Sequence, residues 1–294
     1  MTKLRIILVI LVTSVAAALA LLRGSHQPQP RSHDELRIIS LAPNVTEILF
    51  ALDLGDQVVG VTDQCNYPPA AKGIERVSGF GTPNVEKLLA LGPDMVISCG
   101  LEKPEFANVL QQAGIQVVNV QKTGFIASFP ELFDAVGQIG EATRRPAKAK
   151  ELVADMQGEL DAVAARVGRI DDALRPRVFV EIEQSPLMTA GAGSFVDDLI
   201  GRAGGRNVAH EISSAYPRID PEKVIAWDPE VIVVAHGDRR GEAAARLARH
   251  IGWADVAAVR DRRVIDDIDA DLLFRPGPRL VDGVKALAAR LHPK

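Results

Sequence analysis

The residue types that most often perform chemistry are present in this sequence, but they form no catalytic motif. His210-Glu211 lacks the second histidine of a zinc-protease helix, and Gly191–Phe195 (GAGSF) lacks the glycine that follows the serine in a nucleophile elbow. No P-loop or GxGxxG is present, and the six histidines and two cysteines show no metal-ligand spacing. We therefore expect a protein that is not an enzyme, has no metal site of its own and uses no catalytic cofactor.

A duplicated stretch indicates how the chain is organised. Residues 86–98 read EKLLALGPDMVIS and residues 222–234 read EKVIAWDPEVIVV. Each copy predicts a short apolar helix opened by Glu-Lys, then a proline, an acidic residue and a strand. Asn84 and Asp220 stand two positions before the glutamates, where a side chain can cap the helix. The repeat predicts two similar α/β lobes.

The order of elements predicts the rest of the fold. Strands alternate with helices in both halves, a pattern typical of mostly parallel sheets with covered faces. From Pro146 to about Val167, an apolar stripe at helical spacing predicts one long helix. We expect two doubly wound α/β lobes, 37–145 and 171–294, joined by a backbone helix at 146–170. The ligand cleft should lie between the lobes.

Ligand-binding residues are expected where strands end, because open α/β sheets bind ligands beyond the carboxyl ends of their strands. Phe80 and Tyr216 would offer flat apolar contact, and Asp271 and Arg275 would offer polar contact. His236, just past a predicted strand, would be able to ligate a metal centre in a bound molecule. Packing between the lobes for the aromatic residues, and a solvated loop position for His236, remain open alternatives.

Residues 1–36 form a separate segment. Lys3 and Arg5 precede an almost wholly apolar run, 6–22, which is typical of an export signal or an N-terminal membrane anchor followed by a polar linker. Both interpretations place the folded part outside the cytoplasm, in the periplasm or its equivalent. The segment has no cysteine, so lipid attachment is not expected, and a net charge of −4 gives no case for nucleic-acid binding.

Two pairs of residues have alternative interpretations. Cys65 and Cys99 can form a disulfide outside the cytoplasm or remain two free thiols. Glu86 and Glu222 are stabilised by the helix dipole, by roughly 0.3–1 kcal/mol each. Two matched carboxylates, one per lobe, would also suit docking on a two-fold partner with basic sockets.

Six ordered segments resemble a known family. They are RIISLAPNVTEILFAL, GVTDQCNYPP, VSGFGTPNVEKLLALGPDMVIS, GAGSFVDDLIGRAGGRNVA, DPEKVIAWDPEVIVV and RPGPRLVDGVKALAARLHP. They are similar to the helical-backbone (class III) substrate-binding proteins of ABC importers, the receptors for cobalamin, ferric siderophores and haem. The resemblance implies two α/β lobes joined by one long helix. It also implies that Glu86 and Glu222 dock on arginines of the dimeric permease.

Within this family the chain looks most like the cobalamin-binding proteins, because of its YPP loop, its SGF loop and its terminal D-x-x-x-R-P-G-P-R. The resemblance implies that the following positions touch the corrinoid: Gln64, Phe80, Cys99, Tyr216, Asp271 and Arg275. The aromatic surface is smaller here, with Gln64 and Cys99 at positions that are often aromatic. On the basis of this resemblance we expect a receptor that delivers cobalamin or a related corrinoid to an ABC importer. A haem or ferric-siderophore receptor is the alternative, and an exported enzyme is the alternative of another class.

Overall fold

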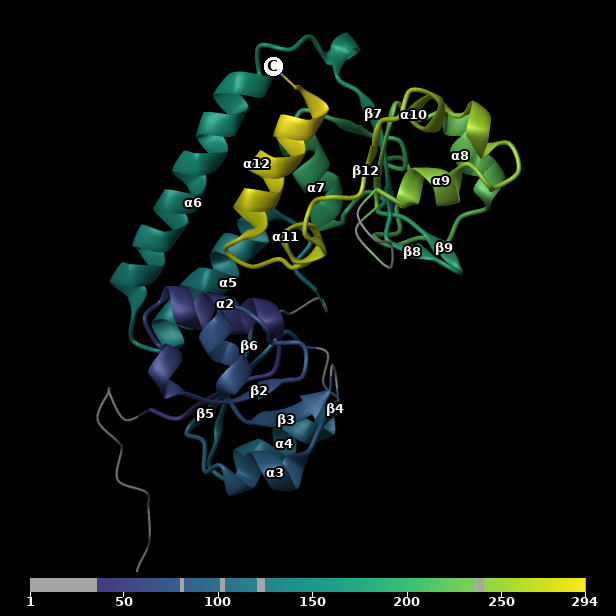
Figure 1. The fold of residues 1–294 in the computed structure, drawn as a ribbon. Coiled ribbons are helices and arrows are strands. Elements are labelled where there is room, and N and C mark those ends of the chain that lie inside the picture. The colour runs from purple at the N-terminus through teal and green to yellow at the C-terminus, as the bar shows by residue number, and fades with distance from the viewer. Residues whose placement is uncertain are drawn as a thin grey trace, which may run out of the picture. The chain divides into compact units, whose positions relative to one another are not determined.

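The structure is a computed structural model that describes residues 36–79, 82–100, 104–120, 125–234, 236 and 241–293 (Figure 1). The chain divides into two units, Met1–Leu36 and Arg37–Lys294, and every element below belongs to the second. The expected export signal or anchor lies outside the described residues. No helix within the described ranges is long and apolar enough to cross a bilayer.

The first lobe is built on a six-stranded sheet with the order β4-β3-β2-β1-β5-β6. Neighbouring strands are parallel except for β3 and β4. The strands are β1 Ile38–Ser40, β2 Val58–Thr62, β3 Arg76–Gly79, β4 Thr82–Pro83, β5 Met95–Ser98 and β6 Gln116–Asn119. The helices are α2 Pro43–Ala51, α3 Val85–Ala90, α4 Pro104–Gln112 and α5 Phe129–Ala142. Parallel strands need crossovers that cover the sheet, and accordingly β1 and β5 are buried along their whole length.

The second lobe has a smaller parallel sheet with the order β10-β7-β11-β12 and a separate hairpin, β8-β9. The strands are β7 Arg177–Glu181, β8 Glu183–Gln184, β9 Leu187–Met188, β10 Arg206–Asn207, β11 Val231–Val234 and β12 Val264–Ile265. The helices are α7 Phe195–Arg202, α8 Pro221–Trp227, α9 Ala243–Leu247, α10 Ala257–Arg260, α11 Ala270–Phe274 and α12 Leu280–Leu291. Phe179 and Trp253 fill its core, with ring centroids 6.2 Å apart.

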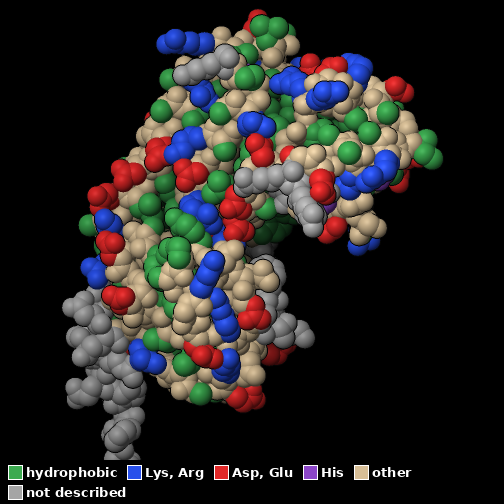
Figure 2. Space-filling view, viewed as in Figure 1, with side chains coloured by type: hydrophobic (Ala, Val, Ile, Leu, Met, Phe, Trp, Pro, Cys, Tyr) green, Lys and Arg blue, Asp and Glu red, His purple; other side chains and the backbone are tan. Residues whose placement is uncertain are grey.

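The long helix α6 spans Pro146–Val167, as the sequence predicts. Met156, Leu160 and Val163 of its apolar stripe are buried, and α6 packs against α5, α12 and α7. Its outer edge carries charges of both signs (Figure 2). The lobes are therefore joined by a packed group of helices, which is a stiffer connection than one free-standing helix.

The duplicated stretch makes the same contacts in both lobes. The acidic residue after each proline accepts a hydrogen bond from the first residue of the neighbouring strand region: Arg37 N–H donates to Asp94 Oδ2 and Arg177 N–H donates to Glu230 Oε2, each at 2.9 Å. The guanidinium groups of both arginines also donate to carbonyls at the end of the repeated helix. The repeat thus fixes the end of a helix to the start of the central strand.

Helix capping differs between the two copies. The Asn84 side chain accepts from Lys87 N–H at 2.8 Å, as predicted. The matching prediction for Asp220 is wrong, because its side chain makes no capping hydrogen bond. The main-chain carbonyl of Asp220 already accepts from Lys223 N–H, at 3.0 Å, so that donor is not available to the side chain.

Candidate functional site

A cavity of about 650 Å³ lies between the two lobes, beyond the carboxyl ends of β1, β2 and β5. The first lobe contributes Ala42, Pro43, Asn44, Gln64, Cys99, Phe125 and Ile126 to its wall. The second lobe contributes Phe195, Tyr216, Ala270, Asp271, Phe274, Arg275 and Pro276. Its position follows the strand-end rule for α/β sheets, and its volume is within the range of small-molecule sites, roughly 300–1,000 Å³.

Aromatic rings form much of the wall. Tyr216 lies between Phe125 of the first lobe and Phe195 of the second, with ring centroids 5.7 and 6.4 Å away, and Phe274 adds a further ring. Burial raises the pKa of the Tyr216 phenol, so this side chain stays neutral at physiological pH. The three phenylalanines were not predicted from the sequence, where Phe195 and Phe274 are indistinguishable from ordinary helix positions.

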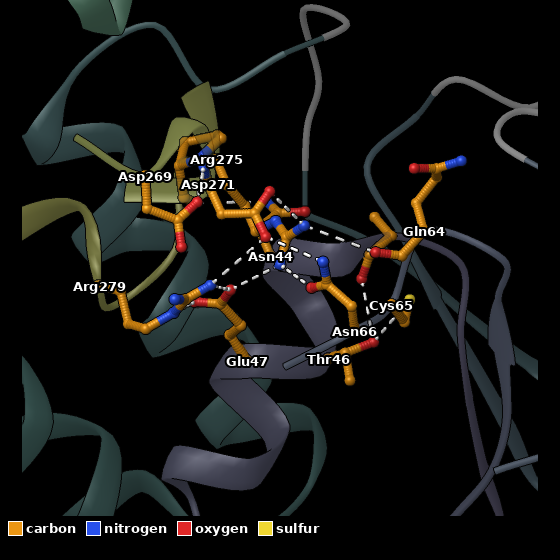
Figure 3. Close-up of polar contacts among 12 residues, drawn as sticks. Asn44, Thr46, Glu47, Gln64, Cys65, Asn66, Asp269, Asp271, Arg275 and Arg279 are labelled. Carbon is orange, nitrogen blue, oxygen red and sulfur yellow. Dashed lines mark hydrogen bonds and ion pairs between the residues drawn. The ribbon is translucent and has the colours of Figure 1, made fainter. Parts of the chain in front are cut away.

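The polar end of the cavity is an ion-pair network across the lobes (Figure 3). Glu47 of α2 accepts hydrogen bonds from Arg275, at 3.0 Å, and from Arg279, at 2.7 and 3.1 Å. The Glu47 side chain is only 2% exposed. A carboxylate buried to this extent needs partners that replace its hydration, and two arginines of the other lobe provide them.

Other side chains complete this network. Asp271 accepts from Arg275 at 2.8 Å and from Asn66 at 2.9 Å, while Asn66 in turn accepts from Arg275 at 2.8 Å. Arg279 lies over the ring of Tyr67, 3.7 Å from the centroid. Burial alone would lower the pKa of Arg279, but its hydrogen bond to Glu47 and the charges of Glu47 and Asp271 outweigh burial and raise that pKa. Arg279 therefore stays charged over the physiological pH range.

The charges of this network balance, because two carboxylates face two guanidinium groups. Asp271 and Arg275, both predicted as ligand-contacting residues, are held in place by residues of the opposite lobe. Glu47 was not predicted from the sequence. The available signal was a glutamate between apolar neighbours of a buried helix, which implies a charged partner elsewhere in the chain.

The remaining predicted ligand residues are placed as follows. Gln64 and Cys99 line the cavity, and the Cys99 thiol donates to Asn44 Oδ1 at 3.3 Å. Phe80 lies outside the described residues. His236 does not line the cavity. Its Nε2 is 3.0 Å from Oε1 of the buried Glu181, a distance typical of an ion pair but without hydrogen-bond alignment.

The structure has no disulfide between Cys65 and Cys99, and both side chains are buried. Cys65 lies against the hydroxyls of Thr46 and Thr62, at 3.1 and 3.2 Å, whereas Cys99 lies against Asn44. The two thiols thus have different neighbours, and each is satisfied where it lies.

We expect non-reduced, exported protein to yield two titratable thiols per chain once it is unfolded in denaturant. Titration of the folded protein should be slow, because both side chains are buried. A titration of unfolded protein that finds thiols only after a reductant is added would instead show that the disulfide forms.

Glu86 and Glu222 lie in the first turns of α3 and α8, and both side chains are exposed. Within the described part of the chain, neither carboxylate forms an ion pair. The two glutamates therefore have matching positions in the repeat and also similar, solvent-exposed surroundings.

A second cavity, of about 940 Å³, lies on the second lobe alone, beside α7 and β10. Four of its ionisable side chains pair with one another: His210 with Asp197 at 2.9 Å, and Arg202 with Asp198 at 2.8 Å. It draws on one lobe, and its large apolar side chains are Trp227 and Val208, whereas four aromatic rings line the inter-lobe cavity, which is therefore the better candidate for a ligand site.

Two α/β lobes, a packed connecting helix and an inter-lobe cavity define a bilobal binding protein. The chain matches the periplasmic binding protein family over residues 38–270 and belongs to that family. Its relatives are named as substrate-binding, vitamin B12-binding and periplasmic heme-binding proteins, and the protein is a substrate-binding protein of an ABC transporter.

Three relatives illustrate the range of this family. An uncharacterized ABC transporter substrate-binding lipoprotein of Bacillus subtilis (strain 168), YvrC, is 32% identical over 274 residues, 92% of this chain and 84% of that protein. The vitamin B12-binding protein of Vibrio cholerae serotype O1 is 30% identical over 258 residues, 87% of this chain and 88% of that protein. The solved structure of the periplasmic heme-binding protein RhuT from Roseiflexus sp. RS-1 superposes with a TM-score of 0.75 at 28% identity, over 87% of this chain and 98% of that one.

Proposed function

We propose that this protein binds cobalamin or a related corrinoid in the inter-lobe cavity and delivers it to the permease of an ABC importer. The observation that carries the proposal is the character of the cavity, which combines aromatic walls with a charge-balanced polar end. The vitamin B12-binding relative, similar over most of both chains, supports it. Residues 1–36 would direct export or anchor the protein, and the lobes 37–145 and 171–294 would flank the backbone helix at 146–170, outside the cytoplasm.

The possible metal-ligating side chains of the cavity favour a corrinoid over a haem. Haem iron is usually held by an axial His, Cys, Met or Tyr. Among the described lining residues, only Tyr216 and Cys99 are of these types. The raised pKa of Tyr216 disfavours the phenolate form that binds ferric iron. The Cys99 thiol is already engaged in a hydrogen bond to Asn44. A cobalamin brings its own axial base and needs no such ligand.

The charge of the cavity argues against an anionic iron chelate. Arg275 is neutralised by Glu47 and Asp271, so the described lining offers no uncompensated cation to an anionic siderophore or to haem propionates. The peripheral amides of a corrinoid need hydrogen-bond donors and acceptors instead. Asn44, Gln64 and Asp271 would provide them, while Tyr216 and Cys99 would lie against the macrocycle. Phe80 remains a proposed contact on the resemblance alone, and His236 is left out because it lies against Glu181.

Docking on the permease is the other part of the proposal. Glu86 and Glu222, exposed and equivalent in the two lobes, would meet basic side chains of the two permease subunits. Exposed charges of this kind mainly accelerate and orient an encounter.

A ligand panel tests the binding proposal. We expect isothermal titration calorimetry to show saturable, one-to-one binding of cyanocobalamin, without turnover. Haemin and a ferric catecholate siderophore, which are both anionic, should give no saturable signal. Saturable binding of either one, with no cobalamin signal, would replace the corrinoid by that ligand and leave the cavity assignment intact.

Two variants locate the site in the same experiment. Tyr216→Ala removes the central ring of the cavity and should weaken cobalamin binding by about tenfold or more, the equivalent of roughly 1.4 kcal/mol. Leu174→Ala is the matched control, since Leu174 is exposed and lies away from the cavity. If both variants bound cobalamin with equal affinity, the binding site would not be the inter-lobe cavity.

A further inference from the structure

The repeated helices expose the same pair of side chains on both lobes. Glu86 and Leu89 lie three residues apart on α3, and Glu222 and Ile225 lie three residues apart on α8. Residues at this spacing are neighbours on one helix face. Leu89 and Ile225 are each 38% exposed, whereas the adjacent Leu88 and Val224 are fully buried in the lobe cores.

The lysine that follows each glutamate is engaged elsewhere. Lys87 pairs with Glu75 at 2.5 Å, and Lys223 lies over the ring of Trp227, 5.5 Å from its centroid. Different partners thus give the same result in the two lobes: the lysine does not neutralise the neighbouring glutamate. Each lobe therefore presents a free carboxylate directly beside an exposed apolar side chain.

The apolar surface is larger on the second lobe. Gly252 adopts a positive φ of 80°, and a Cβ built on it would lie 2.7 Å from Ile225 Cδ1, so the glycine lets Ile225 pack closely over the turn. The preceding residue, Ile251, is 96% exposed. A single exposed leucine or isoleucine is ordinary on a protein surface. The same acidic and apolar pair at equivalent points of the two lobes suggests that both pairs serve one role.

We propose that Leu89 and Ile225 are the apolar half of the docking surface on each lobe. The partner is the two-fold symmetric permease dimer, which would present a shallow apolar socket beside each basic side chain. This inference rests on the proposed transport function. The carboxylates would guide the encounter, and burial of Leu89 and Ile225 would prolong the complex, since residence time depends mainly on desolvated contacts.

The test measures binding of the purified protein to its permease–ATPase complex in lipid nanodiscs by surface plasmon resonance. Leu89→Ala and Ile225→Ala should each raise the dissociation rate about tenfold, as expected for loss of a buried side chain of this size. The effect should persist in high salt, whereas the effect of Glu86→Ala with Glu222→Ala should fade as charges are screened. Leu174→Ala is the control, an exposed leucine outside the repeat.

The outcomes separate this inference from the proposal on which it rests. Wild-type dissociation rates for Leu89→Ala with Ile225→Ala, together with a defect in the glutamate variant, would overturn the apolar contact and leave docking intact. Wild-type behaviour of both double variants would overturn the docking surface as a whole. Unchanged melting temperature and cyanocobalamin affinity of each variant would show that only the surface has changed.

Discussion

Glu47→Ala is expected to lower the free energy of unfolding by about 3–5 kcal/mol, the usual cost of removing one partner from a buried ion pair. The loss is large because two arginines depend on this carboxylate. Arg279 would keep only Asp271, at 4.0 Å, and its stacking on Tyr67. Chemical denaturation monitored by circular dichroism measures the change. Ligand affinity should fall as well, because Arg275 loses one of the contacts that hold it in the cavity wall and keeps those with Asp271 and Asn66.

Two controls make this prediction specific. Glu105→Ala removes an exposed carboxylate of α4 and should leave stability within about 0.5 kcal/mol of the wild type. In a double-mutant cycle, Glu47→Ala combined with Arg279→Ala should cost less than the sum of the single changes, because each removes the other's partner. Additive losses, or a Glu47→Ala protein as stable as the wild type, would contradict the view that the network holds the lobes together.

This network is also the part of the site that the sequence could not reveal. Glu47 and Arg275 are 228 residues apart, and helical periodicity reports only which face of α2 is apolar. The same limit applies to Phe125, whose contact with Tyr216 depends on the packing of the two lobes, and to Phe195, which meets Tyr216 only through the fold of the second lobe. By contrast, the α6 stripe and the 86–98 and 222–234 repeat follow from local patterns, and the structure places those elements as predicted. Asp220 shows that sequence reasoning can also fail within a single helical turn. The main-chain carbonyl of Asp220 accepts the hydrogen bond from Lys223 N–H that its side chain was expected to accept.

The network and the helix packing together bear on how a ligand would enter and leave. The described contacts between the lobes include Glu47 with two arginines, and Asp198 Oδ2 with Phe129 N–H at 3.0 Å. These contacts involve α2, α5, α7 and the segment between α11 and α12, rather than α6 alone. A large hinge opening would break several of these contacts at once. Small displacements of the loops that line the cavity would therefore cost less free energy. Release to a permease would then require a partner that contacts both lobes.

Glu86→Ala combined with Glu222→Ala is expected to reduce ligand uptake to background, while the affinity for the ligand stays unchanged. Both carboxylates are exposed and neither lines the cavity, so their removal leaves the ligand site intact. Each single variant should retain part of the uptake, because one lobe would still be guided to its permease subunit. Uptake of radiolabelled cyanocobalamin by cells, alongside calorimetry on the purified variants, measures the two effects separately.

A matched control separates docking from net charge. Glu105→Ala with Glu211→Ala also removes one exposed carboxylate from each lobe, and thus changes the net charge equally, but at points that the repeat does not relate. This pair should support wild-type uptake. The helix-dipole interpretation of Glu86 and Glu222 predicts a different result, namely a small loss of stability, about 0.3–1 kcal/mol for each residue, with uptake preserved. Normal uptake in the Glu86 and Glu222 double variant would therefore leave the two carboxylates as helix-stabilising residues only.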